Sequence, residues 1–154
     1  MSKLNQDYMK YSKVPIMTKV FLINYRKNKN NKFRNVINKI VCIINSCEIP
    51  LGTKIEGGLR MPHFNGIIIN KDSIIGKNCT IYQQVTIGSN ELKSQGAPII
   101  GDNVYIGAGA KILGNITIGN NVRIGSNAVI VKDIPDNSTV YSKSEIVIRN
   151  NSHA

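Results

Sequence analysis

The residue best suited to acid–base chemistry in this chain is His63, which lies in the stretch GLRMPHFNGIII at residues 58–69. The sequence holds one other histidine, His153, next to the C-terminus. Imidazole has an ordinary pKa of about 6.5, so a histidine is suited to removing a proton from a hydroxyl near neutral pH. The alternative is a core histidine whose ring bonds a backbone carbonyl. The choice depends on the fold that surrounds the residue.

The three cysteines, Cys42, Cys47 and Cys79, are too few and too irregularly spaced to predict a disulfide framework or a zinc site. We interpret them as reduced thiols of a cytoplasmic protein. Cys79 is also a candidate acyl-carrying nucleophile, but its place in the repeat described next favours a buried packing role. The sequence has no run of about 18 apolar residues and no signal-peptide pattern, so we expect no membrane-spanning helix.

A six-residue repeat occupies most of the chain and defines the elements that must position His63. Isoleucine recurs without a break at positions 100, 106, 112, 118, 124 and 130, and similar steps of six precede it. Helices repeat at about 3.6 residues and ordinary strands at two, so neither explains a period of six. Three units of strand and turn make one triangular coil, and stacked coils bury an aliphatic column. Residues 49–134 therefore predict an all-β solenoid of about five coils; an ordinary β-sandwich would give irregular spacing.

Two interruptions break the repeat near His63. The step from Ile67 to Ile75 is eight, and the step from Ile87 to Ile100 is thirteen, one more than two hexads. The second interval contains the polar, Gly- and Pro-containing stretch 89–98, which predicts a loop. In solenoids such insertions map to loops on one face, often the functional face. This pattern favours a functional His63 over a core histidine.

The pattern Ile/Leu/Val-Gly-x-x-small-x resembles that of the hexapeptide-repeat acyltransferases. It is carried by EIPLGTKIEGGLRMPHFNGIIIN (48–70), IGKNCTIYQQVTIGS (75–89) and IGDNVYIGAGAKILGNITIGNNVRIGSNAVIVKDIP (100–135). These stretches are similar to the catalytic domain of serine acetyltransferases, and more closely to short acetyltransferases of bacterial surface-polysaccharide gene clusters. The resemblance implies a left-handed parallel β-helix, acetyl-CoA as co-substrate, and a homotrimer whose sites lie in grooves between neighbouring prisms.

The resemblance also implies roles for individual residues. His63 matches the catalytic base of the family. Glu48, which precedes it in the chain, stands where serine acetyltransferases carry an aspartate that partners the base. Gly88 and Ser89 match the segment whose backbone lies beside the thioester, where backbone N–H groups would stabilise the oxyanion.

A line of small residues extends this candidate cofactor site. Ala108 and Ser126 match positions beside the pantetheine arm, and they are three hexads apart, so they stack in successive coils. We expect Ser89 to fall on the same line as Ala108, because the loop between them contains one residue more than whole hexads would give. Such a line either leaves a groove for the arm or only meets the steric needs of tight turns. Arg123 and Lys132 are either partners for the phosphates of CoA or solvated surface charges.

The acceptor site departs from the serine acetyltransferase pattern. Those enzymes carry an Arg-His pair before the proline of the active-site loop, whereas Gly96 and Ala97 stand before Pro98 here. Pro62 replaces the acid that precedes the catalytic histidine. A site for a free amino acid needs a cation for its carboxylate. We therefore favour a sugar hydroxyl of a bacterial surface polysaccharide or its precursor as acceptor, with L-serine as the alternative.

Positive charge is concentrated in residues 1–46, which hold ten Lys/Arg and one acid, in a chain whose net charge is +11. Aliphatic residues near helical spacing lie between these cations: Val36, Ile37, Ile40, Val41, Ile43 and Ile44. We interpret 1–47 as a basic helical segment, 48–140 as the β-helix domain and 141–154 as a tail. The helical segment either caps the exposed edge of the prism, which we favour, or contacts an anionic inner membrane leaflet. Scarce aromatics and the lack of a known module argue against nucleic-acid binding.

Two other classes of function need consideration on this fold. A γ-type carbonic anhydrase requires three histidine ligands and the chain has two, so we expect no metal. An inactive scaffold solenoid would bind no acetyl-CoA and would tolerate replacement of His63. We therefore predict a cytoplasmic acetyl-CoA-dependent O-acetyltransferase with His63 as its general base.

Overall fold

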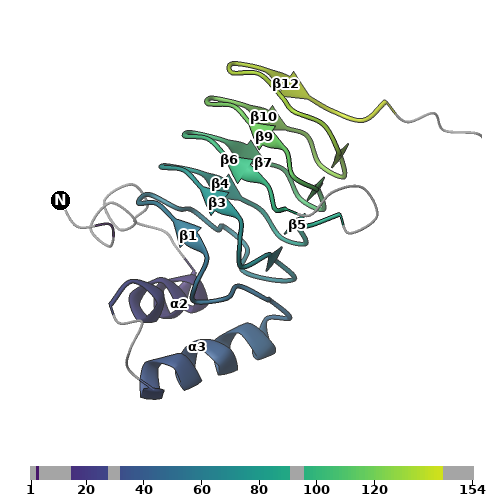
Figure 1. Cartoon of the computed structure of the whole chain (residues 1–154). Helices are drawn as coiled ribbons and strands as arrows, with labels where there is room; N and C mark the ends of the chain where they lie inside the picture. Colours follow the sequence, from purple (N-terminus) through teal and green to yellow (C-terminus); the bar gives the residue numbers. More distant parts are fainter. Residues whose placement is uncertain (1–2, 4–14, 28–31, 91–95, 144–154) are drawn as a thin grey trace, which may run out of the picture.

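In its described part, the protein is a triangular prism of short parallel strands with helices α2 and α3 at one end (Figure 1). The computed structural model describes residues 3, 15–27, 32–90 and 96–143. The chain visits three four-stranded sheets in turn, one per face of the prism, which we name after their first strands. The β1 sheet contains β1 (Lys54–Ile55), β3 (Ile74–Ile75), β6 (Ile99–Ile100) and β9 (Thr117–Ile118). The β4 sheet contains β4 (Thr80–Ile81), β7 (Tyr105–Ile106), β10 (Arg123–Ile124) and β12 (Thr139–Val140). The β2 sheet contains β2 (Ile68–Ile69), β5 (Thr86–Gly88), β8 (Lys111–Leu113) and β11 (Val129–Ile130).

The stacking of the coils confirms the predicted solenoid. Each strand pairs in parallel with its counterpart in the next coil, as Thr86 does with Lys111 and Tyr105 with Arg123. Isolated bridges extend the ladders at both ends of the prism, from Glu48 to Ile68 and from Ile118 to Ile134. The prism therefore contains about five coils, as the length of the repeat predicts.

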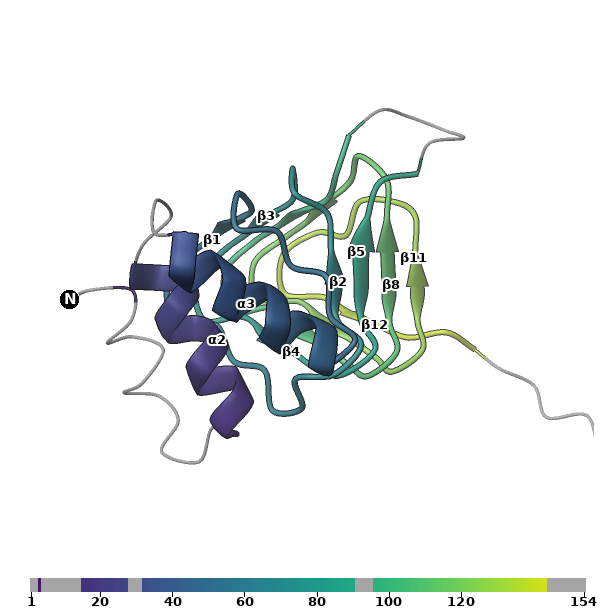
Figure 2. The same cartoon turned by 90° about the horizontal axis from the view of Figure 1, so that it is seen from below.

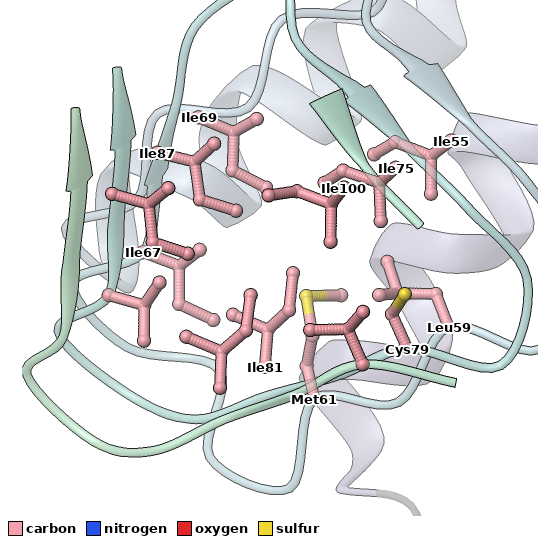
Figure 3. Packing of buried hydrophobic residues seen from close by; sticks show 14 of the residues in the cluster. Ile55, Leu59, Met61, Ile67, Ile69, Ile75, Cys79, Ile81, Ile87 and Ile100 are labelled. Carbon is pink, nitrogen blue, oxygen red and sulfur yellow. The ribbon is translucent and has the colours of Figure 1, made fainter. Parts of the chain in front are cut away.

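The core is an aliphatic column along the prism axis. Figure 3 shows isoleucines of successive coils pointing into the interior, among them Ile75, Ile81 and Ile87, which are completely buried. The small or aliphatic residue that stands four places after each isoleucine is buried too: Cys79, Val85, Val104, Ala110, Ile116, Val122 and Ala128. Cys79 thus has the packing role that its place in the repeat predicts. All three cysteines are free thiols.

Asparagine provides many of the corners of the prism. Asn103, Asn121 and Asn137 all have φ near +60°, a left-handed conformation that asparagine tolerates better than most residues. Their side chains also form a ladder, in which Asn103 donates to Asn121 and Asn121 donates to Asn137. These turn residues therefore also bond one coil to the next.

The first helix, α2 (Ile16–Lys27), caps the open end of the prism. The Tyr25 hydroxyl donates to the carbonyl of Thr53 at 2.6 Å, and the Arg26 guanidinium donates to the carbonyls of Ile55 and Glu56. These carbonyls lie along β1, the edge strand of its sheet, which no further strand pairs with among the described residues. The cap that we favoured from the sequence is confirmed for α2, because polar side chains satisfy an edge that would otherwise attract another strand.

The second helix, α3 (Lys32–Ile44), lies beside α2 at the same end of the molecule, as the view from below shows (Figure 2). It buries Asn38 and Val41 but leaves Val36, Ile40 and Ile43 exposed. The capping role that we favoured for this segment therefore does not extend to most of the aliphatic residues of α3, because α2 already covers the end of the column. Within the described residues, neither helix has the length and apolar content that crossing a membrane requires.

Candidate active site

His63 lies in an irregular turn that the strand register locates closely. Arg60 pairs with Thr80, whereas Ile68, eight positions after Arg60, pairs with Thr86, only six positions after Thr80. Two extra residues are therefore inserted between Arg60 and Ile68, and they push the turn outward. The side chain of His63 is exposed, while its neighbours Met61 and Phe64 are buried and anchor the turn. A core histidine is excluded by this exposure.

Two tyrosines lie next to the imidazole along the outer face of the β4 sheet. The ring centroids of His63 and Tyr82 are 6.2 Å apart, and those of Tyr82 and Tyr105 are 5.3 Å apart. The pKa of Tyr105 is raised, chiefly by burial and then by its hydrogen bond with Tyr82, although Arg123 and Arg60 act in the opposite direction. Neither tyrosine was predicted from the sequence, because the residues inserted between Ile87 and Ile100 hide that their strands, β4 and β7, are neighbours.

Glu48 is held at the start of the first coil. Its N–H donates to the Ile67 carbonyl at 2.9 Å, and its own carbonyl accepts from Ile69 at 2.8 Å. The side chain is exposed and borders a cavity of about 430 Å³ between α3 and residues 47–51. Among the described residues, neither a hydrogen bond nor an ion pair joins Glu48 to His63. The partnership of these two residues stays a prediction.

The cysteines beside Glu48 are not activated. Cys42 and Cys47 border the same cavity. Burial is the main cause that raises the pKa of the Cys42 thiol to about 11, and burial raises the pKa of Cys47 as well. Both thiols are therefore protonated near neutral pH, which argues against a nucleophilic role for either.

Ala108 and Ser126 stack as the sequence predicts. They follow the paired strands β7 and β10, and the N–H of Asn127 donates to the Ala108 carbonyl at 2.8 Å. A Cβ placed on the neighbouring Gly107 would lie 2.7 Å from the backbone nitrogen of Ser126. Successive coils therefore approach closely at this edge, which leaves a strip with little side-chain volume. Such a strip has the shape that a thin pantetheine arm requires, and it begins on the same edge as the His63 turn.

Ser89 does not lie on this line, so that expectation is wrong. The strand register places it elsewhere: Gly88 pairs with Leu113 and accepts a hydrogen bond from Gly114 at 2.9 Å. The interval from Ile87 to Ile100 is thus one hexad with seven further positions inserted, rather than two hexads with one extra. Gly88 and Ser89 consequently lie at the opposite edge of the β2 sheet from Ala108.

The two predicted phosphate-binding cations lie on different faces. Arg123 is exposed on β10 of the β4 sheet, in register with Tyr105. Lys132 is exposed just after β11 of the β2 sheet. Residues 91–95 of the predicted active-site loop, and His153 with the rest of the chain from 144, lie outside the described residues.

Comparison with known proteins agrees with this architecture. Residues 97–132 match the model of the bacterial transferase hexapeptide family, which covers six repeats. The serine acetyltransferase of Staphylococcus xylosus is 42% identical over 115 residues, which are 74% of this chain and 53% of that protein. That of Synechococcus elongatus is 41% identical over 99 residues, or 64% of this chain and 41% of that protein. The chain thus spans about half the length of the relatives it matches.

Solved structures of similar fold carry the same description. Serine acetyltransferase isoform 3 of Entamoeba histolytica, in complex with cysteine, aligns with a TM-score of 0.76 at 26% identity, over 97% of this chain and 59% of that chain. The soybean serine acetyltransferase complexed with serine aligns with a TM-score of 0.69 at 27% identity, over 82% and 54%. With its six-residue repeat folded into a left-handed β-helix, the chain belongs to the hexapeptide-repeat acyltransferases and is similar to the serine acetyltransferases among them.

Proposed function

We propose that the protein transfers an acetyl group from acetyl-CoA to an acceptor hydroxyl, with His63 as the general base. The observation that carries this proposal is the exposed imidazole in a turn with two inserted positions, at the edge where Ala108 and Ser126 leave a strip of low side-chain volume. Regular coils need no insertion, so the outward turn is better explained by a site than by packing.

The chemistry follows from the position of the imidazole. His63 removes the hydroxyl proton as the acceptor oxygen attacks the thioester carbonyl, and the resulting imidazolium returns the proton to the departing thiolate. The bound thioester supplies the electrophilic carbonyl. Backbone N–H groups near Gly88 and Ser89 are the proposed donors for the oxyanion, as removing one such donor elsewhere costs roughly 3 kcal/mol. Glu48 would orient the ring and steady its positive charge.

A trimer is part of the proposal. Gly88 and Ser89 lie at one edge of the β2 sheet, and His63, Ala108 and Ser126 at the other, so one prism does not bring them together. A groove between neighbouring prisms would combine one edge of each. Arg123 and Lys132, which lie on different faces of one prism, would then meet the phosphates of CoA from two subunits. We place the reaction in the cytoplasm, where acetyl-CoA is available.

L-Serine is the first acceptor to test, because proteins named serine acetyltransferase are 41% to 45% identical to this chain over their matched regions. This reverses the order that the sequence alone favoured, in which a polysaccharide sugar came first. One structural observation still supports a sugar hydroxyl as the second candidate. Gly96 has a φ of +143°, and a Cβ there would lie 2.7 Å from the Asn115 side chain. An arginine is therefore poorly accommodated where serine acetyltransferases carry one.

The decisive experiment measures release of free CoA thiol from acetyl-CoA with L-serine and with a panel of sugars and glycolipids. Turnover with L-serine supports the first acceptor, and turnover with a sugar alone supports the second. The His63→Ala variant is the control, since it should abolish turnover with either. A thermal-shift titration with CoA tests binding separately, because a ligand of the native state raises its stability. No turnover together with no CoA-induced shift would favour a scaffold and overturn the proposal.

A further inference from the structure

Five large apolar side chains form an exposed stripe on α3. We call Phe33, Val36, Ile40, Ile43 and Ile44 the α3 stripe; their exposed fractions run from 50% to 74%. Their spacing along the helix places them on one side, within about a third of its circumference at about 100° per residue. The buried residues of the helix, Asn38 and Val41, lie on another side. Single apolar residues are common on protein surfaces, but a contiguous stripe of five marks a contact surface.

Cations accompany the stripe, and acids are missing from both helices. Lys32 and Lys39 are exposed and fall along one flank of the stripe, next to Val36 and Ile43. Neither lysine has an ion-pair partner among the described residues. The sequences of α2 and α3 contain no aspartate or glutamate. The two helices therefore contribute only positive charge to the surface around the stripe, and Glu48, which borders the same cavity as Lys39 and Ile43, is an exposed acid at its C-terminal end.

The position of α3 makes this surface accessible. Both helices lie at one end of the prism, with α3 farther from the strands than α2 (Figure 1). α2 makes the capping hydrogen bonds to the first coil, so α3 is not required to cover that end.

From these observations we propose that α3 docks in the plane of an anionic lipid bilayer. The stripe enters the boundary between headgroups and acyl chains, and Lys32 and Lys39 meet the lipid phosphates. A second copy of the chain fits less well, because two α3 helices packed face to face would bring lysines together and neither helix carries an acid to pair them. The docking goes beyond acetyl transfer and does not depend on which hydroxyl is the acceptor.

The test is cosedimentation of the full chain with vesicles of phosphatidylcholine and phosphatidylglycerol, compared with vesicles of phosphatidylcholine alone. We expect binding to the anionic vesicles, weakened by salt because the attraction is screened. Ile40→Asp should reduce the partition coefficient by about tenfold or more, since it removes a buried apolar side chain from the interface. Ile99→Asp is the matched control, because Ile99 is exposed to a similar extent (42% against 50%) but lies on the side of the prism.

A charge variant supplies an independent test. Lys32→Gln and Lys39→Gln together should weaken binding by about 25-fold, at about fivefold per cation near an anionic surface. Lys77→Gln, at an exposed turn of the prism, should have little effect. Circular dichroism and the oligomeric state in solution accompany each variant. Failure to bind anionic vesicles, or equal loss with Ile40→Asp and Ile99→Asp, would overturn the proposal. A change of oligomeric state in Ile40→Asp would do so too, by assigning the stripe to a second copy.

Discussion

The imidazole of His63 and the ring of Tyr82 lie 6.2 Å apart between centroids, with their planes inclined by 48°. The two residues come from successive coils: His63 from the irregular turn that follows Arg60, and Tyr82 from the residue that follows β4. Tyr105 continues the row one coil further on. The imidazole is thus bounded by an aromatic ring toward the prism and open toward solvent.

Replacing His63 should remove activity without affecting stability. We expect His63→Ala to lower kcat by about 10²- to 10⁴-fold, the range that a lost general base explains. Because the side chain is exposed, the free energy of unfolding should change by less than about 0.5 kcal/mol. Steady-state kinetics and urea unfolding check the two statements. Retained turnover in a folded variant would assign the base to another residue.

Tyr82 should act as a positioning residue for the imidazole. We expect Tyr82→Ala to lower kcat by about tenfold, because a displaced imidazole removes the proton of the acceptor hydroxyl less efficiently. Tyr82→Phe, which keeps the ring, should retain most of the activity. The pH profile of kcat should keep its shape in both variants, since the base itself is unchanged. An equal loss in the Phe and Ala variants would instead point to a role for the hydroxyl.

Gly107 should be irreplaceable for steric reasons. A Cβ at this position would lie 2.7 Å from the Ser126 nitrogen and 2.9 Å from the Gly125 carbonyl carbon, so the backbones of two coils would have to separate. We expect Gly107→Ala to destabilise the protein by about 1 to 3 kcal/mol. Gly52→Ala is the matched control, because a Cβ there meets no atom within 4 Å. That control should be neutral or stabilise by up to about 1 kcal/mol. Similar effects of the two substitutions in thermal unfolding would contradict this explanation.

The asparagine ladder allows a backbone effect to be separated from a side-chain effect. Asn121 has a φ of +57° and bonds to both Asn103 and Asn137. Asn121→Ala should cost about 1 to 2 kcal/mol from the left-handed backbone, in addition to the lost hydrogen bonds. Asn121→Gly should recover much of the backbone part. Chemical denaturation of the two variants measures the difference, and a glycine variant no more stable than the alanine variant would contradict the backbone contribution.

The repeat predicted the prism well because each hexad makes the same steric demand. An isoleucine that points inward, a small neighbour and a turn residue recur whatever the rest of the sequence does, so coil number and core follow from spacing. The interval from Ile87 to Ile100 shows the limit of this reasoning. A step of thirteen fits two hexads with one extra residue or one hexad with seven extra, and only the pairing of Ile87 with Ile112 distinguishes them. The misplacement of Ser89 followed from that choice.

The helices show a second limit. Periodicity identified aliphatic residues at helical spacing in 36–44, but it does not say which of them face the protein. The structure turns Val41 and Asn38 inward and leaves Ile40 and Ile43 outside, because α2 had already satisfied the edge of β1 through Tyr25. Likewise, the spacing of Glu48 and His63 follows from the family pattern, whereas whether their side chains meet depends on rotamers that no spacing fixes.

The cap formed by Tyr25 should make stability depend on pH in the alkaline range. Burial raises the pKa of this tyrosine from 10.0 to about 12, so the unfolded chain loses the proton more readily than the folded one. The corresponding stabilisation is complete below pH 10, falls as the pH rises toward 12, and amounts to on the order of 2 to 3 kcal/mol. In Tyr25→Phe this contribution is absent, and the hydrogen bond to the Thr53 carbonyl is lost as well.

We therefore expect the Tyr25→Phe variant to be less stable than the parent near pH 9, and the difference in stability to shrink as the pH approaches 12. Urea unfolding of both proteins across this range checks the expectation, because all other groups titrate alike in the two. A difference that stays constant with pH would show that the Tyr25 hydroxyl is not held in the buried, hydrogen-bonded position that closes the end of the prism.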